Sequence, residues 1–111
     1  EAQALSSKLH TEWLDNSGPL HVTGGGSANP EILKVFANVH NRPVHCHPTT
    51  NAAALGSALK ACHGDRPDLP WLDLVTPFVS ASAVIEPDPS TRAIYSELLD
   101  AYQQLEASIS L

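Results

Sequence analysis

The sequence predicts an α/β fold built on a βαβ unit, with two parallel strands and flanking helices. Two short apolar runs at residues 20–23 and 44–47 are typical of buried strands, and an amphipathic segment at 30–40 separates them. Strands joined through a helix run parallel, and the crossover between them is right-handed. Ligands in such sheets bind beyond the carboxyl ends of the strands, so a site is expected directly after the first strand.

The helices are recognised by apolar residues that recur every three or four positions. A first helix is expected over residues 2–15, with Trp13 on its apolar stripe and with Gly18 and Pro19 ending it. The helix at 30–40 is expected to bury a stripe of four apolar side chains: Ile32, Val35, Phe36 and Val39.

A third helix is expected over residues 51–62, capped by Thr49 or Thr50 and stopped by Gly64. Gly56 lies in the interior of this helix, where glycine costs about 1 kcal/mol relative to alanine. We therefore expect Gly56 to allow close packing on a neighbouring helix or strand.

The back of the chain divides into a connector and a last helix. Residues 64–89 are rich in proline but carry hydrophobic anchors, and Val84 with Ile85 is expected to form a short extended piece. A terminal helix over 90–110 follows, capped by Ser90 or Thr91. Its apolar stripe is formed by residues at helical spacing: Ile94, Leu98, Tyr102 or Ala101, Leu105 and Ile109.

A run of three glycines follows the first strand. Gly24, Gly25 and Gly26 carry no Cβ, so the chain can turn through positive φ and a ligand can approach its N–H groups. Asn29 and Pro30 then suit the N-cap and first position of a helix, whose N-terminus favours an anion. The turn is therefore either a nucleotide site or a plain strand-to-helix connection.

Several catalytic patterns are excluded around this turn. Ser27 lacks the second glycine of a hydrolase nucleophile elbow. No Lys-Ser or Lys-Thr pair follows the glycines, as a Walker A loop requires, and the GxGxxG fingerprint is incomplete. Glu86 and Asp88 lie among prolines and are interpreted as a solvated turn. We expect no catalytic residue in this chain.

Charge and composition limit the partners. The net charge is −6, and all of it falls after His63, where eight acidic residues face two basic ones. Nucleic acid is excluded as a partner because phosphate contacts need clustered Lys and Arg. No apolar run is long enough to span a membrane. Two cysteines form no disulfide framework and fit a reducing compartment, so a cytoplasmic location is expected.

Six histidines raise the question of a metal. His45 and His47 would share one face of a strand while Cys46 points to the other. A closed zinc site needs about four ligands, and no CxxC or HExxH spacing supplies the rest. No metal site is therefore expected.

The chain resembles the C-terminal end of the FGGY carbohydrate kinases. The family's motifs appear in the family's order and spacing over residues 20–63, and the last helix is similar to the tail of xylulose kinases. The matching segments are His21-Val-Thr-Gly-Gly-Gly-Ser-Ala-Asn-Pro-Glu-Ile-Leu33, Phe36-Ala-Asn-Val39, Arg42-Pro-Val44, Asn51-Ala-Ala-Ala-Leu-Gly-Ser-Ala-Leu59 and Pro89-Ser-Thr-Arg-Ala-Ile-Tyr-Ser-Glu-Leu-Leu99. Asn38 stands where the family usually has Asp, and Asn51 where an acid is frequent.

The resemblance implies a partial actin-like, ribonuclease-H-like ATPase lobe, forming the C-terminal part of the second lobe of such a kinase over residues 1–111. It also implies ATP and Mg²⁺ as cofactors of the full-length enzyme. The adenosine motif would be made by five residues: Gly24, Gly25, Gly26, Ser27 and Asn29. The resemblance implies a pentulose as the substrate, with D-xylulose as the leading candidate. The alternatives are a kinase for ribulose or another polyol, or a non-catalytic actin-like nucleotide-binding or assembly module.

The same resemblance implies that the sugar pocket, the phosphate-gripping loops and the general-base Asp lie upstream of Glu1. Because the chain opens with Glu1 rather than Met, we expect further residues upstream of it. We therefore expect this chain alone to be inactive. A two-strand parallel sheet also leaves open edges, to be covered by the rest of its own polypeptide or by another copy.

Overall fold

A small mixed sheet organises the fold. In the computed structural model, which describes residues 1–14, 17–47, 49 and 51–109, β1 (Leu20–Val22), β2 (Val44–Cys46) and β3 (Ala83–Ile85) form a sheet in that order. β1 pairs in parallel with β2, with Leu20 opposite Val44, and β3 pairs antiparallel to β2. The parallel βαβ unit is confirmed, and the extended piece predicted inside the connector becomes the third strand.

Helix α2 (Pro30–His40) provides the crossover and fills the core. Its side chains Leu33 and Ala37 pack with Val44 against one face of the sheet. Val39 packs with Ala4 and Leu5 on the other side of the helix. Contact on two sides explains why the predicted stripe is partly wrong: Leu33 is buried instead of Ile32, which is exposed.

Helix α1 (Ala2–His10) packs on α2 and is shorter than the spacing predicted. The Thr11 hydroxyl donates to the Ser7 carbonyl at 2.7 Å, and the Trp13 indole N–H donates to the His10 carbonyl at 2.8 Å. Side chains that take the last carbonyls compete with further helical turns. Trp13 is therefore exposed, Gly18 does not end the helix, and residue 15 lies outside the described residues.

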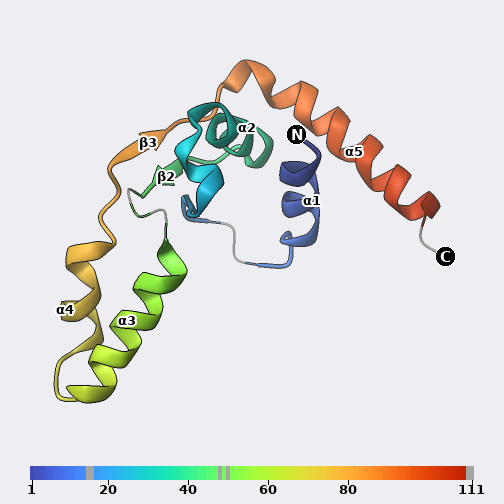
Figure 1. Cartoon of the computed structure of the whole chain (residues 1–111). Helices are drawn as coiled ribbons and strands as arrows, with labels where there is room; N and C mark the ends of the chain where they lie inside the picture. Colours follow the sequence, from blue (N-terminus) through green and yellow to red (C-terminus); the bar gives the residue numbers. More distant parts are fainter. Residues whose placement is uncertain (15–16, 48, 50, 110–111) are drawn as a thin grey trace.

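Helices α3 (Ala52–Asp65) and α4 (Trp71–Val75) form an arm that projects from the carboxyl end of β2 (Figure 1). Asn51 caps α3, its side chain accepting from Ala54 N at 3.4 Å, in place of the predicted Thr49. The alternative cap, Thr50, lies outside the described residues. Gly64 does not stop the helix, because α3 continues to Asp65. The predicted connector thus contains a helix and a 3₁₀ turn at Thr76–Phe78.

Helix α5 (Arg92–Ile109) follows a 3₁₀ turn at Pro89–Thr91. Asp88 caps this 3₁₀ turn, its side chain accepting from Ser90 N at 2.9 Å, so the capping bond precedes the predicted Ser90 or Thr91. Tyr102, which belongs to the predicted stripe, packs toward α1 and α2 together with Tyr95 and Leu99, which do not. Most of the predicted stripe is exposed instead: Ile94, Leu98, Leu105 and Ile109. Residue 110 lies outside the described residues.

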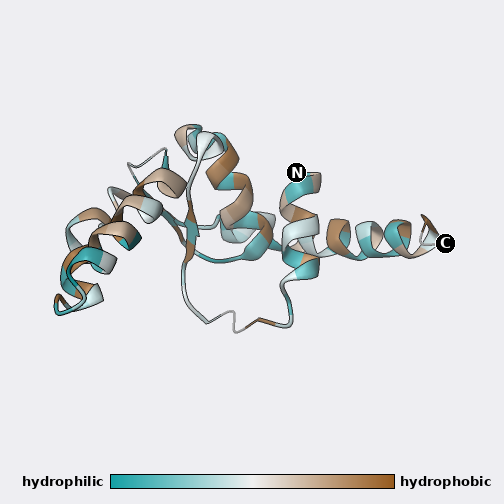
Figure 2. Cartoon of the chain, turned by 60° about the horizontal axis from the view of Figure 1, so that its bottom comes forward, coloured by the Kyte–Doolittle hydropathy of each residue, from teal (hydrophilic) through white to brown (hydrophobic). Residues whose placement is uncertain are grey.

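The molecule is extended. Its radius of gyration is 17.1 Å, against about 13 Å for a compact domain of this length. The α3–α4 arm and α5 project from opposite sides of the sheet, and apolar residues are visible along both (Figure 2). Among the residues described, no helix combines the length and apolar character needed to cross a bilayer.

Candidate functional site

The glycine turn connects the carboxyl end of β1 to the N-terminus of α2. Gly24 has φ +93°, in the left-handed region that favours glycine, and Gly25–Ala28 form one 3₁₀ turn. The predicted positive φ is thus confirmed at Gly24; among the described residues, Asn41 is the other one with φ in this region. The Ser27 hydroxyl donates to the Gly24 carbonyl at 2.7 Å and closes the turn.

The three glycines present open backbone. A Cβ built at Gly24, Gly25 or Gly26 would meet nothing within 4 Å inside this chain. At Gly25 and Gly26, no backbone strain and no internal crowding therefore accounts for the missing side chain. What the turn provides is a stretch of backbone that a ligand can approach without passing a side chain.

Asn29 is the N-cap of α2, and Pro30 is the first residue of that helix, as predicted. The Asn29 Oδ1 accepts from Glu31 N at 3.0 Å. This bond uses only the oxygen of the side-chain amide, so the Nδ2 donor is not part of the cap. Capping and contact with a ligand are therefore compatible at Asn29.

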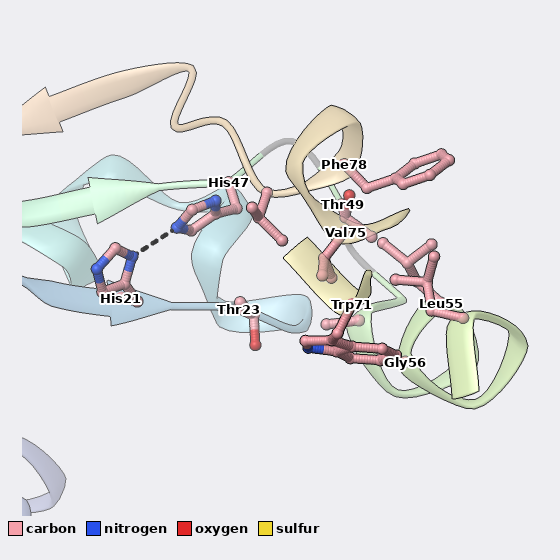
Figure 3. A pocket seen from close by; sticks show the side chains of 12 residues that line it. His21, Thr23, His47, Thr49, Leu55, Gly56, Trp71, Val75 and Phe78 are labelled. Carbon is pink, nitrogen blue, oxygen red and sulfur yellow. Dashed lines mark hydrogen bonds between the residues drawn. The ribbon is translucent and has the colours of Figure 1, made fainter. Parts of the chain in front are cut away.

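A separate cavity of about 430 Å³ lies between the arm and the face of the sheet opposite α2. Thr23 belongs to its lining, whereas none of the predicted nucleotide residues from Gly24 to Asn29 does. Figure 3 shows side chains from α3 and α4 on one side of it and, on the other, His21 of β1 and His47, which directly follows β2. The lining is mostly apolar and aromatic, and includes Leu55, Trp71 and Phe78.

Histidines from both parallel strands meet at this cavity. His21 on β1 is opposite His45 on β2, with ring centroids 5.1 Å apart, and His21 Nδ1 lies 2.8 Å from His47 Nε2 (Figure 3). A bond between two imidazole nitrogens needs one N–H and one lone pair. Desolvation, followed by the charges of His47 and His45, lowers the pKa of His21. The uncharged ring is therefore favoured at the base of the cavity.

Sequence spacing placed His45 and His47 on one face but did not add His21 to them. The signal was the parallel register, which places a residue of β1 beside its partner on β2. No group of three or more His, Cys, Asp or Glu in the described part of the chain is arranged to hold a metal ion.

The surroundings of Gly56 differ from the prediction. Gly56 lines the cavity, and a Cβ built on it would meet nothing within 4 Å. The expected close packing on a neighbouring helix or strand is therefore wrong within this chain. The reason is that α3 extends away from the sheet, so that Leu59 is its one buried residue among those described.

The parallel β1–β2 pair, with α2 and α1 stacked on one face and α3 leading away from the other, is part of an actin-like ATPase fold. The model of the FGGY family of carbohydrate kinases, C-terminal domain, matches residues 1–64. The chain belongs to the FGGY family of carbohydrate kinases.

Two relatives align with nearly the whole chain. The chain is 32% identical to a xylulose kinase of Rattus norvegicus over 98% of its length, and 31% identical to a ribulokinase of Mycolicibacterium smegmatis over 95%. The crystal structure of xylulose kinase from Rhodospirillum rubrum superposes with a TM-score of 0.76 at 29% identity, over 96% of this chain. The chain spans about a fifth of these proteins: 22%, 20% and 22% of their lengths.

Proposed function

We propose that this chain is the nucleotide-side, C-terminal segment of an ATP-dependent kinase that phosphorylates a pentulose, with D-xylulose as the substrate. The observation that carries the proposal is the open glycine turn at the carboxyl end of β1, leading directly into the capped N-terminus of α2. Such a position binds anionic and nucleotide ligands in parallel α/β sheets. Similarity to xylulose kinases over nearly the whole chain supports the choice of sugar.

In this proposal the turn holds the adenosine end of ATP. The backbone of Gly25 and Gly26 lies against the nucleotide, with Gly24 and Ser27 setting the shape of the turn, and the Asn29 amide contacts the base. Mg²⁺ belongs with the phosphates and would neutralise their charge during transfer. The attacking sugar hydroxyl and its general base belong to the rest of the kinase, so this segment positions the nucleotide.

The nucleotide assignment is tested by Gly25→Val in the intact kinase. A side chain at this position meets nothing inside the chain, so folding is expected to be unchanged while the nucleotide is pushed away. We expect the Kd for ATP to rise by about tenfold, which corresponds to about 1.4 kcal/mol. Isothermal titration calorimetry with ATP measures this change.

The matched control is Gly64→Val, at another glycine with open space around its Cβ, near the end of α3 and outside the turn. ATP affinity is expected to be unchanged there. Equal affinities in the parent and in Gly25→Val would contradict the assignment.

The 111-residue chain by itself is expected to be inactive. Its proposed role is to bind the nucleotide side, and the general base is expected in the rest of the kinase. A coupled assay for ADP release with D-xylulose measures this directly. Turnover by the purified chain above a no-enzyme blank would overturn the division of roles.

Ribulose is the second candidate substrate, because a ribulokinase is nearly as similar as the xylulose kinases. Comparing kcat/KM for D-xylulose and for ribulose in the intact kinase separates the two. We place the kinase in the cytoplasm; its two cysteines, Cys46 and Cys62, are free, which supports a reducing compartment.

A further inference from the structure

A polar cavity of about 270 Å³ lies where α1, the end of α2 and the start of α5 meet (Figure 1). Lys8 of α1 and Arg92 of α5 bring two positive charges to its wall, and Asn38 and His40 of α2 add polar groups. None of the described residues that line it is Asp or Glu. In a chain with a net charge of −6, this cavity therefore collects positive charge without an acidic counterpart.

The effect of this positive charge is seen at His40. Burial, followed by the charges of Lys8 and Arg42, lowers the pKa of His40 to about 4. No carboxylate is among the groups that cause this shift, and a nearby carboxylate would instead raise the pKa of a histidine. His40 is therefore uncharged at neutral pH, and Lys8 and Arg92 are the charged side chains of the wall.

Asn38 opens a fixed donor onto the same cavity. The residue is 8% exposed, and its Oδ1 accepts from Asp88 N at 2.8 Å, which sets the orientation of the amide. Among the described residues no acceptor takes the Nδ2 hydrogens, and no fully buried side-chain nitrogen or oxygen is left unpaired. The Nδ2 group is therefore accessible, and because Asn38 lines the cavity, this donor is available to an acceptor that enters there.

Lys8 and Arg92 also keep unused donors. The Arg92 guanidinium forms no hydrogen bond or ion pair with any residue that the structure describes. Lys8 Nζ donates to the Val39 carbonyl at 2.9 Å, which leaves its other N–H groups available. The same bond, together with the bonds that the Asn41 N–H donates, occupies the carbonyl end of α2, which would otherwise repel an anion.

We propose that this cavity binds a phosphate-type oxyanion between the Lys8 ammonium, the Arg92 guanidinium and the Asn38 amide. These donors come from three helices and approach an anion from different directions, which suits a tetrahedral phosphate group. Arg and Lys are the side chains that proteins use to bind phosphate. The proposal does not depend on the glycine turn, because no residue from Gly24 to Asn29 lines this cavity.

The test uses three variants of the intact kinase. Asn38→Asp keeps an acceptor for Asp88 N and adds a negative charge to the cavity, so the fold is retained while an anion is repelled. Arg92→Gln removes one positive charge from an exposed residue. Arg66→Gln is the matched control, because Arg66 is an exposed arginine that follows α3 and does not line the cavity.

Isothermal titration calorimetry with sodium phosphate, at constant ionic strength and with saturating ADP present, measures the Kd. We expect saturable binding in the parent and an unchanged Kd in Arg66→Gln. The Kd is expected to rise by at least about tenfold in Asn38→Asp and in Arg92→Gln, because each change removes or opposes a charge-assisted hydrogen bond. Absence of saturable binding in the parent, or equal Kd values in all four proteins, would overturn the proposal.

A second titration distinguishes the two sources of such an anion, inorganic phosphate and a sugar phosphate. Tighter binding of D-ribose 5-phosphate than of inorganic phosphate, with the same loss in Asn38→Asp, supports a phosphorylated sugar as the ligand. Tighter binding of inorganic phosphate supports the free ion. The Kd for ADP is measured on the same proteins, and a parallel loss of ADP and phosphate binding in Asn38→Asp would place the phosphate in the nucleotide site and overturn the proposal.

Discussion

The two halves of this molecule differ in how far their apolar side chains are buried. In the half made of the sheet, α1, α2 and the start of α5, two clusters bury Leu33, Val39 and Val44 almost completely. In the α3–α4 arm, Leu59 is the one buried apolar side chain among the described residues, while Trp71, Leu72 and Phe78 are exposed. Apolar spacing therefore indicates that a face will be covered, but not that the same chain covers it.

Truncation at the centre of the first half is expected to have the largest effect. Leu33 is 2% exposed and packs between α2 and the sheet. Leu33→Ala is expected to lower the free energy of unfolding by about 2–5 kcal/mol, through lost transfer energy and an unfilled cavity. Leu72→Ala is the matched control in the arm, at 73% exposure, and is expected to change it by less than about 0.5 kcal/mol.

Urea denaturation followed by circular dichroism measures both leucine variants. A similar loss in the two would mean that the arm is packed as tightly as the sheet half, and would remove the contrast between them.

A pair of asparagines gives the next largest difference. The Asn38 Oδ1 accepts from Asp88 N at 2.8 Å, in a residue that is 8% exposed, and joins α2 to the turn before α5. Asn38→Ala is expected to cost about 1–3 kcal/mol, because the partner N–H loses its acceptor. Asn51→Ala, which removes the longer and exposed bond to Ala54 N in the arm, is expected to cost less than about 1 kcal/mol.

Chemical denaturation of these two variants gives the ranking. An Asn51→Ala loss equal to that of Asn38→Ala would show that the arm helix depends on its cap as strongly as the sheet half depends on its buried amide.

His40 adds a pH dependence to the sheet half. Burial, followed by the charges of Lys8 and Arg42, lowers the pKa of His40 from 6.5 to about 4. The unfolded chain therefore binds more protons between pH 4 and pH 6.5, and stability rises with pH across that window. Above pH 6.5 the contribution of His40 is complete, and as pH falls toward 4 it is lost.

Partial exposure and solvent screening reduce this contribution to about 1–2 kcal/mol. Denaturation midpoints measured at pH 4.5 and pH 7, in the parent and in His40→Gln, isolate it. An unchanged pH slope in His40→Gln would show that other groups cause the dependence.

Local chemistry was readable from the sequence in the glycine turn and at the start of α2, whereas the predicted ends of α1 and α3 and the cap of α3 were wrong. Asn29 and Pro30 start α2 as predicted, and Gly24 adopts positive φ in the turn. The parallel pairing of β1 and β2 followed from the helix between them. The resemblance to the FGGY kinases also came from local motifs, which the family match over residues 1–64 confirms. The nucleotide contacts of the turn stay a prediction.

The remaining differences depend on which elements meet. Ile32 and Leu33 are neighbours with similar hydropathy, and only the contact of α2 with both α1 and the sheet decides that Leu33 is buried. His21 joins His47 through the register of two strands that are far apart in the sequence.

By itself, the sequence determined the βαβ unit, the glycine turn and the family, because backbone preferences and the spacing of motifs are encoded within a few residues. Only the tertiary structure decided where α1 ends, that the connector contributes β3 and α4, and that Gly56 faces an open groove instead of a packed neighbour. The physical reason is that burial is a property of pairs of surfaces. A single stripe or a single glycine specifies only one surface of each pair.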